Sequence, residues 1–224
     1  ICVDGQHTRN QMINDYNAHE ENLLFSGRPR EDELYTFNQE ITIRVRTALD
    51  IPKDKKVLLY MPTWREHGNL ELSKELWEKE LSDDFVMLVR AHHFTKTAPE
   101  ISNNSFWINV SDYPDVNELY WISDVLISDY SSAFFDYGLL AKPMVCFAYD
   151  YDEFEKNPGL IMELKNEFPS GIKYTEEEVI NFIKHMDFEE EGRKTKAYID
   201  SYLSRPTNST KMCVDRISEL LSTK

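Results

Sequence analysis

The chain has 224 residues, a hydrophobic content of 41% and a formal net charge of −15, from 40 acidic and 25 basic residues. This hydrophobic content is sufficient for a packed core, so the composition excludes an intrinsically disordered chain. The acidic excess argues against a nucleic-acid binder and against direct docking of this surface on an anionic membrane, because both partners are negatively charged. No apolar run approaches the roughly 20 residues of a membrane-spanning helix, and no signal peptide is visible.

The three cysteines give no sign of a structural framework. Cys2, Cys146 and Cys213 are far apart, odd in number and without CxxC spacing, so neither disulfides nor a zinc site are indicated. Cys146 lies in an apolar run that predicts a buried strand, and free thiols fit a reducing cytoplasm. The chain begins at Ile1 rather than Met, so we expect a fragment of a longer protein.

Short apolar runs alternate with amphipathic segments along the chain. Residues 1–20 predict a helix or an irregular lead-in, and residues 22–26 a short strand followed by a turn at 27–30. Residues 31–49 carry apolar side chains at helical spacing. Further strands are predicted at 57–61, 85–90, 106–110, 125–128 and 144–148, and helices at 70–81, 116–122, 132–140, 175–186, 192–203 and 211–222.

This alternation of short strands and helices is typical of βα units with a parallel sheet. We therefore predict an α/β fold, a Rossmann-like parallel sheet with flanking helices, over residues 21–186. Residues 1–20 are a lead-in, and residues 187–224 form C-terminal helices packed on the domain. Asp115 is suited to cap the helix that follows it, and the acidic run 189–191 is expected in a solvated loop.

Polar clusters follow three of the predicted strands. They are Pro-Thr-Trp-Arg at 62–65, Arg-Ala-His at 90–92 and Ser-Asp-Tyr-Ser-Ser at 128–132. In open α/β sheets ligands bind outside the carboxyl ends of the strands. The three clusters therefore predict one site, and their arginines, histidine and hydroxyls suit a diphosphate.

Each cluster also has a purely structural interpretation. Ser131 and Ser132 at a helix start predict phosphate binding, whereas Ser128 or Asp129 could simply cap that helix. Arg65 suits a bidentate phosphate contact beside the Thr63 hydroxyl, but it could instead stack on a buried tryptophan.

The histidine and the remaining motifs are weaker signals. His92 could donate to a phosphate or carry a proton to a leaving group, or be a surface residue beside His93, and the His-His pair is a poor metal signal. The turn at 27–30, Gly-Arg-Pro-Arg, predicts a loop fixed by proline and glycine more than a role in chemistry. No dinucleotide fingerprint, Walker motif or G-x-S-x-G is present, so neither a nicotinamide nor an ATP cofactor is predicted.

Taken in order, these motifs resemble the CDP-glycerol glycerophosphotransferase family, which builds the poly(glycerol phosphate) chains of teichoic acids and related capsule polymers. The resemblance covers roughly residues 22–185. It rests on SGRPRED at 26–32, YMPTWR at 60–65, RAH at 90–92, SDVLISDYSS at 123–132, Lys-Pro at 142–143, the segment 147–151 and FPSG at 168–171.

The resemblance implies a GT-B fold, in which two Rossmann-like domains enclose the active site. The matched motifs belong to the C-terminal, nucleotide-binding half, so an N-terminal acceptor domain, which carries the family's proposed histidine base, is missing from this chain. The implied donor is CDP-glycerol, and the implied product is glycerol phosphate joined to a polymer or lipid-linked acceptor. In this reading the protein is cytoplasmic, peripheral at the inner face of the membrane, and contacts the membrane through its other parts.

The resemblance also implies roles for individual residues. His92 and Arg65 would be catalytic and stabilise charge on the transferred and leaving phosphates. The residues implied in substrate binding are Thr63, Arg90, Ser111, Asp129, Ser131, Ser132 and Lys156. Ser111 opens the loop 111–114, which topology places at the base pocket, and Lys156 is the only cation in the loop where the family has an Arg-Gly pair. No metal is implied.

Two other functions remain open on the sequence. A GT-B glycosyltransferase would use the same fold with a sugar nucleotide. A non-catalytic nucleotide-binding domain would explain the altered loop around Lys156. Binding of CDP-glycerol in preference to UDP- or GDP-sugars distinguishes the first alternative, and the complete reading frame bears on the second.

Overall fold

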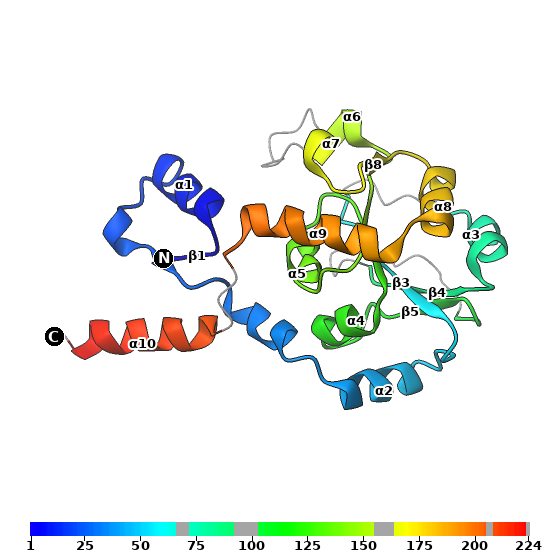
Figure 1. The fold of residues 1–224 in the computed structure, drawn as a ribbon, viewed down its shortest axis with the longest axis horizontal. Coiled ribbons are helices and arrows are strands. Elements are labelled where there is room, and N and C mark those ends of the chain that lie inside the picture. The colour runs from blue at the N-terminus through cyan, green and yellow to red at the C-terminus, as the bar shows by residue number, and fades with distance from the viewer. Residues whose placement is uncertain (66–71, 92–102, 155–163, 205–207, 223–224) are drawn as a thin grey trace.

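The computed structural model describes residues 1–65, 72–91, 103–154, 164–204 and 208–222. A parallel sheet of six strands forms its centre, in the order β5-β4-β3-β6-β7-β8 (Figure 1). Counted along the chain within this sheet alone, the order is 3-2-1-4-5-6, that of a dinucleotide-binding Rossmann fold. The strands are β3 (Lys56–Tyr60), β4 (Phe85–Val89), β5 (Trp107–Asn109), β6 (Val125–Ser128), β7 (Met144–Phe147) and β8 (Ile172–Lys173).

Helices cover both faces of the sheet, so its central strands are apolar throughout. Successive residues of β3 alternate between the faces: Val57 and Leu59 join one core, and Leu58 and Tyr60 the other. The first core is closed by α2 (Gln39–Ala48), α4 (Val116–Ile122), α5 (Ala133–Gly138) and α9 (Phe188–Tyr202). The second is closed by α3 (Lys74–Leu81) and α8 (Glu176–His185). The predicted Rossmann-like fold with flanking helices is confirmed.

The predicted helix starts follow their capping residues. Asp115 caps α4 by accepting from the backbone N–H of Asn117 at 2.9 Å, as predicted. Thr175 caps α8 through a capping box with Glu178. The predicted solvated loop at 189–191 is wrong: Asp187 caps α9, so this acidic run forms the helix's first turn, and Glu191 is buried.

Two predicted elements are divided or displaced. The helix predicted over residues 31–49 is two helices, η2 (Pro29–Tyr35) and α2, because Asn38 accepts hydrogen bonds from the first amides of α2 and starts a new helix. The strand predicted at 22–26 is β2 (Leu24–Phe25), after the short η1 (Glu20–Asn22), and it pairs with β1 (Cys2–Val3) rather than with the main sheet. The predicted helix at 70–81 begins, within the described residues, at Lys74.

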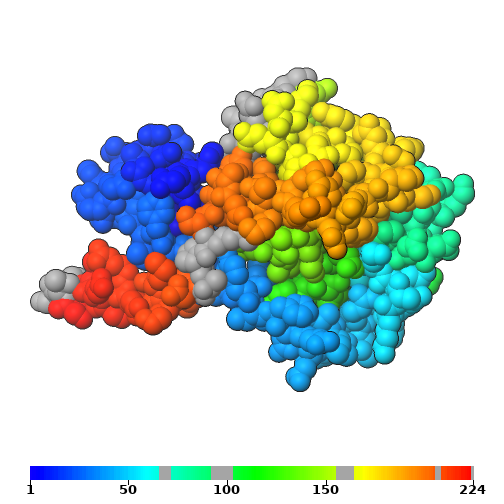
Figure 2. Space-filling model, viewed as in Figure 1, coloured from blue at the N-terminus to red at the C-terminus, as the bar shows by residue number. Residues whose placement is uncertain are grey.

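The N-terminal segment and the last helix lie together at one end of the molecule, away from the sheet (Figures 1 and 2). This end contains β1, α1 (Gln6–Asn14), β2 and α10 (Ser209–Ser222). Asp32 of η2 holds the start of α10 by accepting from the amides of Ser209 and Thr210, at 2.9 and 2.8 Å. In the part of the chain that the structure describes, no helix is long and apolar enough to cross a membrane.

Candidate functional site

A pocket of about 290 Å³ opens at the carboxyl ends of β3, β4 and β6. It lies at the point where the strand order reverses, with β4 and β5 on one side of β3 and β6 to β8 on the other. Ligands of open α/β sheets bind at such a switch point. The pocket is lined by Met61, Pro62, Thr63, Arg90, Ala91, Ser111, Val116, Tyr120, Ser131, Ser132, Ala133 and Asp136.

Five of the nine site residues predicted from the sequence line this one pocket. They are Thr63, Arg90, Ser111, Ser131 and Ser132. Two more, Arg65 and Asp129, lie directly beside Thr63 and are described below. The last two, His92 and Lys156, lie outside the described residues; His92 directly follows the pocket residues Arg90 and Ala91 in the chain.

Asp129 joins the ends of β3 and β6 beneath the pocket. Its side chain is 3% exposed, and it accepts from the backbone N–H and the hydroxyl of Thr63, both at 2.9 Å. It also accepts from the N–H of Tyr130 at 2.8 Å. A buried carboxylate needs such donors, because unpaired it would be strongly destabilising. Asp129 therefore fixes the position of Thr63 at the pocket wall.

Arg65 is held by two carboxylates. Its guanidinium donates to Asp129 at 2.8 Å, and to both oxygens of Asp150 at 2.7 and 3.1 Å. The guanidinium also lies 5.0 Å from the ring centroid of Tyr130 and 5.1 Å from that of Phe154. The alternative of an arginine stacked on a buried tryptophan is wrong, since Trp64 is 45% exposed and the rings belong to other residues.

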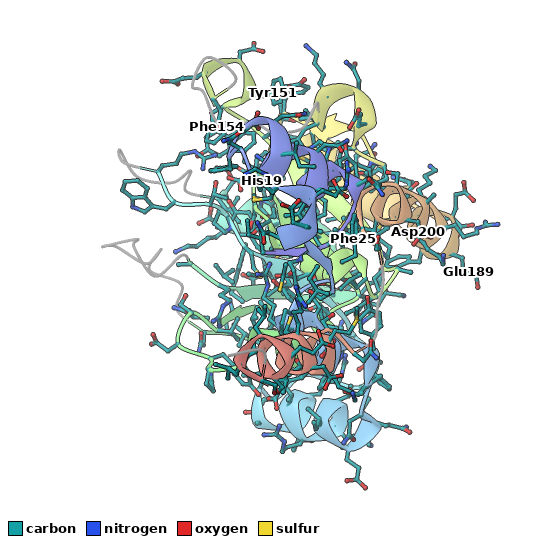
Figure 3. All side chains as sticks on the ribbon, turned by 90° about the vertical axis from the view of Figure 1, so that its left-hand side faces the viewer. His19, Phe25, Tyr151, Phe154, Glu189 and Asp200 are labelled. Atoms are coloured by element: carbon teal, nitrogen blue, oxygen red, sulfur yellow. The ribbon has the colours of Figure 1, made fainter. Side chains whose placement is uncertain are left out.

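The aromatic side of this cluster comes from α6 (Tyr151–Phe154), which follows β7. Phe154 stacks on Tyr130 with ring centroids 3.7 Å apart, and it lies with Tyr151 at the upper end of Figure 3. The Tyr130 hydroxyl donates to Asp150 at 2.9 Å. Burial opposes ionisation of Asp150, but the hydrogen bond and charge of Arg65 outweigh it and lower the pKa of Asp150. The ion pair of Arg65 with Asp150 thus persists across neutral pH.

The start of α5 has free backbone donors. Ser131 caps the helix, since its hydroxyl oxygen accepts from the N–H of Ala133 at 3.1 Å. Among the described residues, no atom accepts a hydrogen bond from the N–H of Ser131 or of Ser132. The alternative of capping by Ser128 or Asp129 is wrong, because Ser128 donates to the carbonyl of Met61 and Asp129 binds Thr63. The two serine amides remain available to an anion in the pocket.

Arg90 shapes the opposite wall. It donates to the carbonyls of Val110 at 3.1 Å and Tyr113 at 2.6 Å, and so fixes the loop after β5. The backbone N–H of Ala91 donates to the Ser111 hydroxyl at 3.0 Å. On the far side of this loop is a second hollow of about 570 Å³, lined by Leu49, Asn103, Asn109, Val110, Asp112, Tyr113 and Pro114.

Sequence reasoning missed a carboxylate cluster beside the pocket. Asp136, one helical turn beyond Ser132 on α5, lines the pocket and pairs with Arg30 at 3.1 Å and Arg28 at 3.4 Å. Glu31 is buried against them, with Arg28 at 2.5 Å. Burial raises the pKa of Glu31 to about 8; Asp136 adds to this effect and Arg28 opposes it.

The turn at 27–30 therefore does more than connect β2 to η2. Arg28 also pairs with Asp4 at 3.2 Å, so three carboxyl groups share the charges of Arg28 and Arg30. The spacing of four residues between Ser132 and Asp136 was the available signal, because it places both on one helix face. Within the described ranges, no three His, Cys, Asp or Glu side chains gather as a metal site would require.

Comparison with known proteins identifies the family. The family model described as CDP-glycerol:poly(glycerophosphate) glycerophosphotransferase matches residues 1–217. The chain belongs to this family. The resemblance recognised in the sequence motifs is thereby confirmed.

Similar proteins include two named teichoic acid enzymes of Staphylococcus. A teichoic acid poly(glycerol phosphate) polymerase of Staphylococcus epidermidis is 44% identical over 170 residues, covering 70% of this chain and 23% of the relative. A teichoic acid glycerol-phosphate transferase of Staphylococcus aureus is 35% identical over 186 residues, covering 78% of this chain and 48% of the relative. The chain thus spans half or less of the length of these two proteins.

Solved structures agree with the fold. A structure of the wall teichoic acid polymerase TagF, soaked with CDPG, superposes with a TM-score of 0.87 at 33% identity, covering 99% of this chain and 58% of that one. A UDP-GlcNAc 2-epimerase of Neisseria meningitidis superposes with a TM-score of 0.62 at 15% identity, a likeness of fold alone. The predicted Rossmann-like half of a GT-B fold is confirmed.

Proposed function

We propose that this chain is the donor-binding part of a glycerophosphotransferase, which binds CDP-glycerol and positions its glycerol phosphate for transfer to an acceptor hydroxyl. The observation that carries this proposal is the pocket at the switch point between β3 and β6. It gathers five residues predicted to bind substrate, in a chain that belongs to the glycerophosphotransferase family. The names of the relatives, polymerases and transferases of glycerol phosphate, agree with this choice.

The reaction is a displacement at phosphorus. The acceptor hydroxyl oxygen attacks the phosphorus that bears glycerol, the bond between that phosphorus and the bridging oxygen breaks, and CMP leaves with the electron pair. The hydroxyl proton passes to a base, which the family resemblance assigns to an N-terminal domain outside this chain. In phosphoryl transfer the protein mainly positions the reactants and stabilises developing charge.

The serine amides at the start of α5 are the proposed diphosphate site. Ser131 and Ser132 present N–H groups that no described residue accepts, and the Ser132 side chain is exposed at the pocket. Thr63 and Arg90, which follow β3 and β4, line the same pocket. The second hollow is the proposed base site because the loop 111–114 borders both spaces: Ser111 lines the pocket, and Asp112, Tyr113 and Pro114 line the hollow.

The catalytic assignments of Arg65 and His92 remain predictions. The contacts of Arg65 favour a positioning role, since its donors already bind Asp129 and Asp150. In the chain, His92 directly follows the pocket residues Arg90 and Ala91, and we propose that it donates to the leaving phosphate. Lys156 comes two residues after the end of α6.

The partners follow from the same assignment. We propose a polymer or lipid-linked acceptor, bound by an N-terminal domain outside this chain, and a cytoplasmic protein held at the inner face of the membrane by its other parts. Nucleic acid is not a proposed partner, since the net charge is −15.

Calorimetry with this chain tests the proposal. We expect CDP-glycerol and CDP to bind, UDP- and GDP-sugars to bind much more weakly, and transfer by this chain alone to be slow or undetectable. Absence of CDP-glycerol binding at millimolar concentration would overturn the donor site. Preference for a sugar nucleotide would instead favour a glycosyltransferase, and binding without transfer in the full-length protein would favour a non-catalytic domain.

A further inference from the structure

Two cysteines from opposite ends of the chain meet at the end of the molecule away from the pocket. The sulfur atoms of Cys2 on β1 and Cys213 on α10 lie 3.3 Å apart, although 211 residues separate them. Both are free thiols; Cys2 is exposed and Cys213 is half-buried, whereas Cys146 is fully buried in the sheet. The spacing of cysteines along the chain could not report this contact, because 211 residues separate the two sulfurs.

Both thiols are held by ordered backbone. β1 pairs with β2, where Cys2 lies opposite Leu24, and the amide of Gly27 donates to the carbonyl of Val3 at 3.2 Å. The amide of Ser209 donates to the carboxylate of Asp32. This contact fixes the start of α10 four residues before Cys213. The two sulfurs thus face each other across a fixed junction, and a covalent bond between them needs only a small approach, since a disulfide is about 2.0 Å long.

The surroundings make the two thiols chemically unequal. The hydroxyl of Ser26 lies 3.5 Å from the Cys213 sulfur. Hydrogen bonding to Ser26 lowers the pKa of Cys2 and outweighs burial, which opposes it. For Cys213 the Ser26 bond acts in the same direction, but burial and the neighbouring Cys2 outweigh it and raise the pKa. Cys2, exposed and more acidic, is the thiolate that an oxidant in solution reaches first.

We propose that Cys2 and Cys213 form a peroxide-sensitive disulfide that ties α10 to the β1–β2 pair. The Cys2 thiolate attacks one oxygen of hydrogen peroxide; the O–O bond breaks, hydroxide leaves, and the sulfur becomes a sulfenic acid. The Cys213 sulfur then attacks the Cys2 sulfur, loses its proton and displaces hydroxide, which leaves as water. In sum, two thiols and one peroxide give one disulfide and two waters, and a dithiol reductant reverses the bond.

This disulfide would constrain the position of α10 relative to the N-terminal strands and would leave the pocket unchanged. α10 projects from the domain with Val214, Ile217 and Leu221 exposed by 55%, 56% and 69%, and its start is held by η2. A disulfide at Cys213 adds a covalent tether between this helix and the N-terminal strands. Because the tether closes a loop of almost the entire chain, it restricts the unfolded ensemble and raises the unfolding temperature.

Oxidation of the purified protein tests the proposal. After treatment with a small excess of hydrogen peroxide, we expect the number of titratable thiols in denaturant to fall from three to one, with an intact mass lower by about 2 Da. Peptide mapping should give one cross-linked pair containing Cys2 and Cys213, and the oxidised protein should unfold several degrees higher than the same sample after reduction.

Matched variants give the control. Cys2→Ser and Cys213→Ser should each form no internal disulfide and show no rise in unfolding temperature, while their reduced forms melt close to the reduced wild type. The proposal is overturned if all three thiols survive peroxide, if the product is a dimer linked between chains, or if the mapped bond contains Cys146.

Discussion

The guanidinium of Arg65 donates to the carboxylate of Asp129 at 2.8 Å, and this contact ties the loop after β3 to the end of β6. The same guanidinium holds Asp150 after β7 through two further hydrogen bonds. The three side chains are only 13%, 3% and 19% exposed. The strand ends that support the pocket are thus joined by one buried arginine, and its removal should affect the fold as well as ligand binding.

Replacing Arg65 with methionine should strongly destabilise the protein. Asp129 and Asp150 would be left without their cation, and removing one partner of a buried pair costs about 3–5 kcal/mol. Arg65→Lys should cost less, since it keeps the charge but loses the planar fork. Urea unfolding measures both, with Arg216→Met as control, because its exposed pair with Glu219 on α10 is worth at most about 1 kcal/mol. Normal stability of Arg65→Met together with lost CDP-glycerol affinity would instead assign Arg65 a direct phosphate contact.

His92 should be essential for transfer in the full-length enzyme. Loss of a positioned acid or electrostatic group lowers rates by about 10²–10⁴-fold, and we expect His92→Ala to fall in this range. His93→Ala is the matched control and should lower the rate much less, because the motif histidine is His92. Single-turnover transfer from CDP-glycerol measures both. Equal losses in the two variants would show that the motif is wrongly assigned.

Glu31 should make the folded state less stable as the pH rises. Its folded pKa is raised from 4.5 to about 8, chiefly by burial. The folded protein therefore retains a proton that the unfolded chain releases, and this stabilisation is complete below pH 4.5 and is lost as the pH rises through 8. Arg28 pairs directly with Glu31, and Arg28 and Arg30 in turn pair with Asp4 and Asp136 around it.

Glu31→Gln tests this dependence because the amide imitates the protonated acid. We expect the free energy of unfolding of the wild type to fall by about 1 kcal/mol or more between pH 6 and pH 9 relative to that of the variant. Glu40→Gln, at an exposed position on α2, is the control and should follow the wild type. Parallel pH profiles for wild type and Glu31→Gln would contradict the assignment.

Local sequence patterns predicted the elements that periodicity and capping determine. The apolar runs gave β3, β4, β6 and β7, and Asp115 marked the start of α4 through a short-range hydrogen bond. The interruption before α2 was missed because the apolar spacing continues across it, although Asn38 was a readable capping signal. β8 has two residues, too few for any period to be visible.

The pocket was predictable for a different reason. Parallel strands bring their carboxyl ends to one edge, so Thr63, Arg90 and Ser131 meet once the strands are located. Pairings across long separations carry no such signal: Asp150 lies 85 residues from Arg65, and Cys2 lies 211 residues from Cys213. Arg65 was expected to be available for phosphate, and the three-dimensional structure was needed to find the carboxylates that hold it.

The start of α5 provides the sharpest test of the donor site. Ser132 is exposed, makes no side-chain cap and lines the pocket, so Ser132→Ala should leave the unfolding temperature unchanged. That variant removes at most one hydroxyl hydrogen bond, and CDP affinity should fall by about 0.5–1.5 kcal/mol, somewhat more if the partner is a charged phosphate.

Ser132→Leu should block the approach of a phosphate to the two free amides and abolish measurable CDP binding, again with little effect on stability, because Ser132 is exposed. Ser131→Ala is the contrasting variant: Ser131 caps α5 through the Ala133 amide, so its loss should cost about 1 kcal/mol of folding stability. Calorimetry and thermal melts on the three variants separate the two roles. If Ser132→Leu binds CDP like the wild type, the diphosphate lies elsewhere, and the amides at the start of α5 do not bind it.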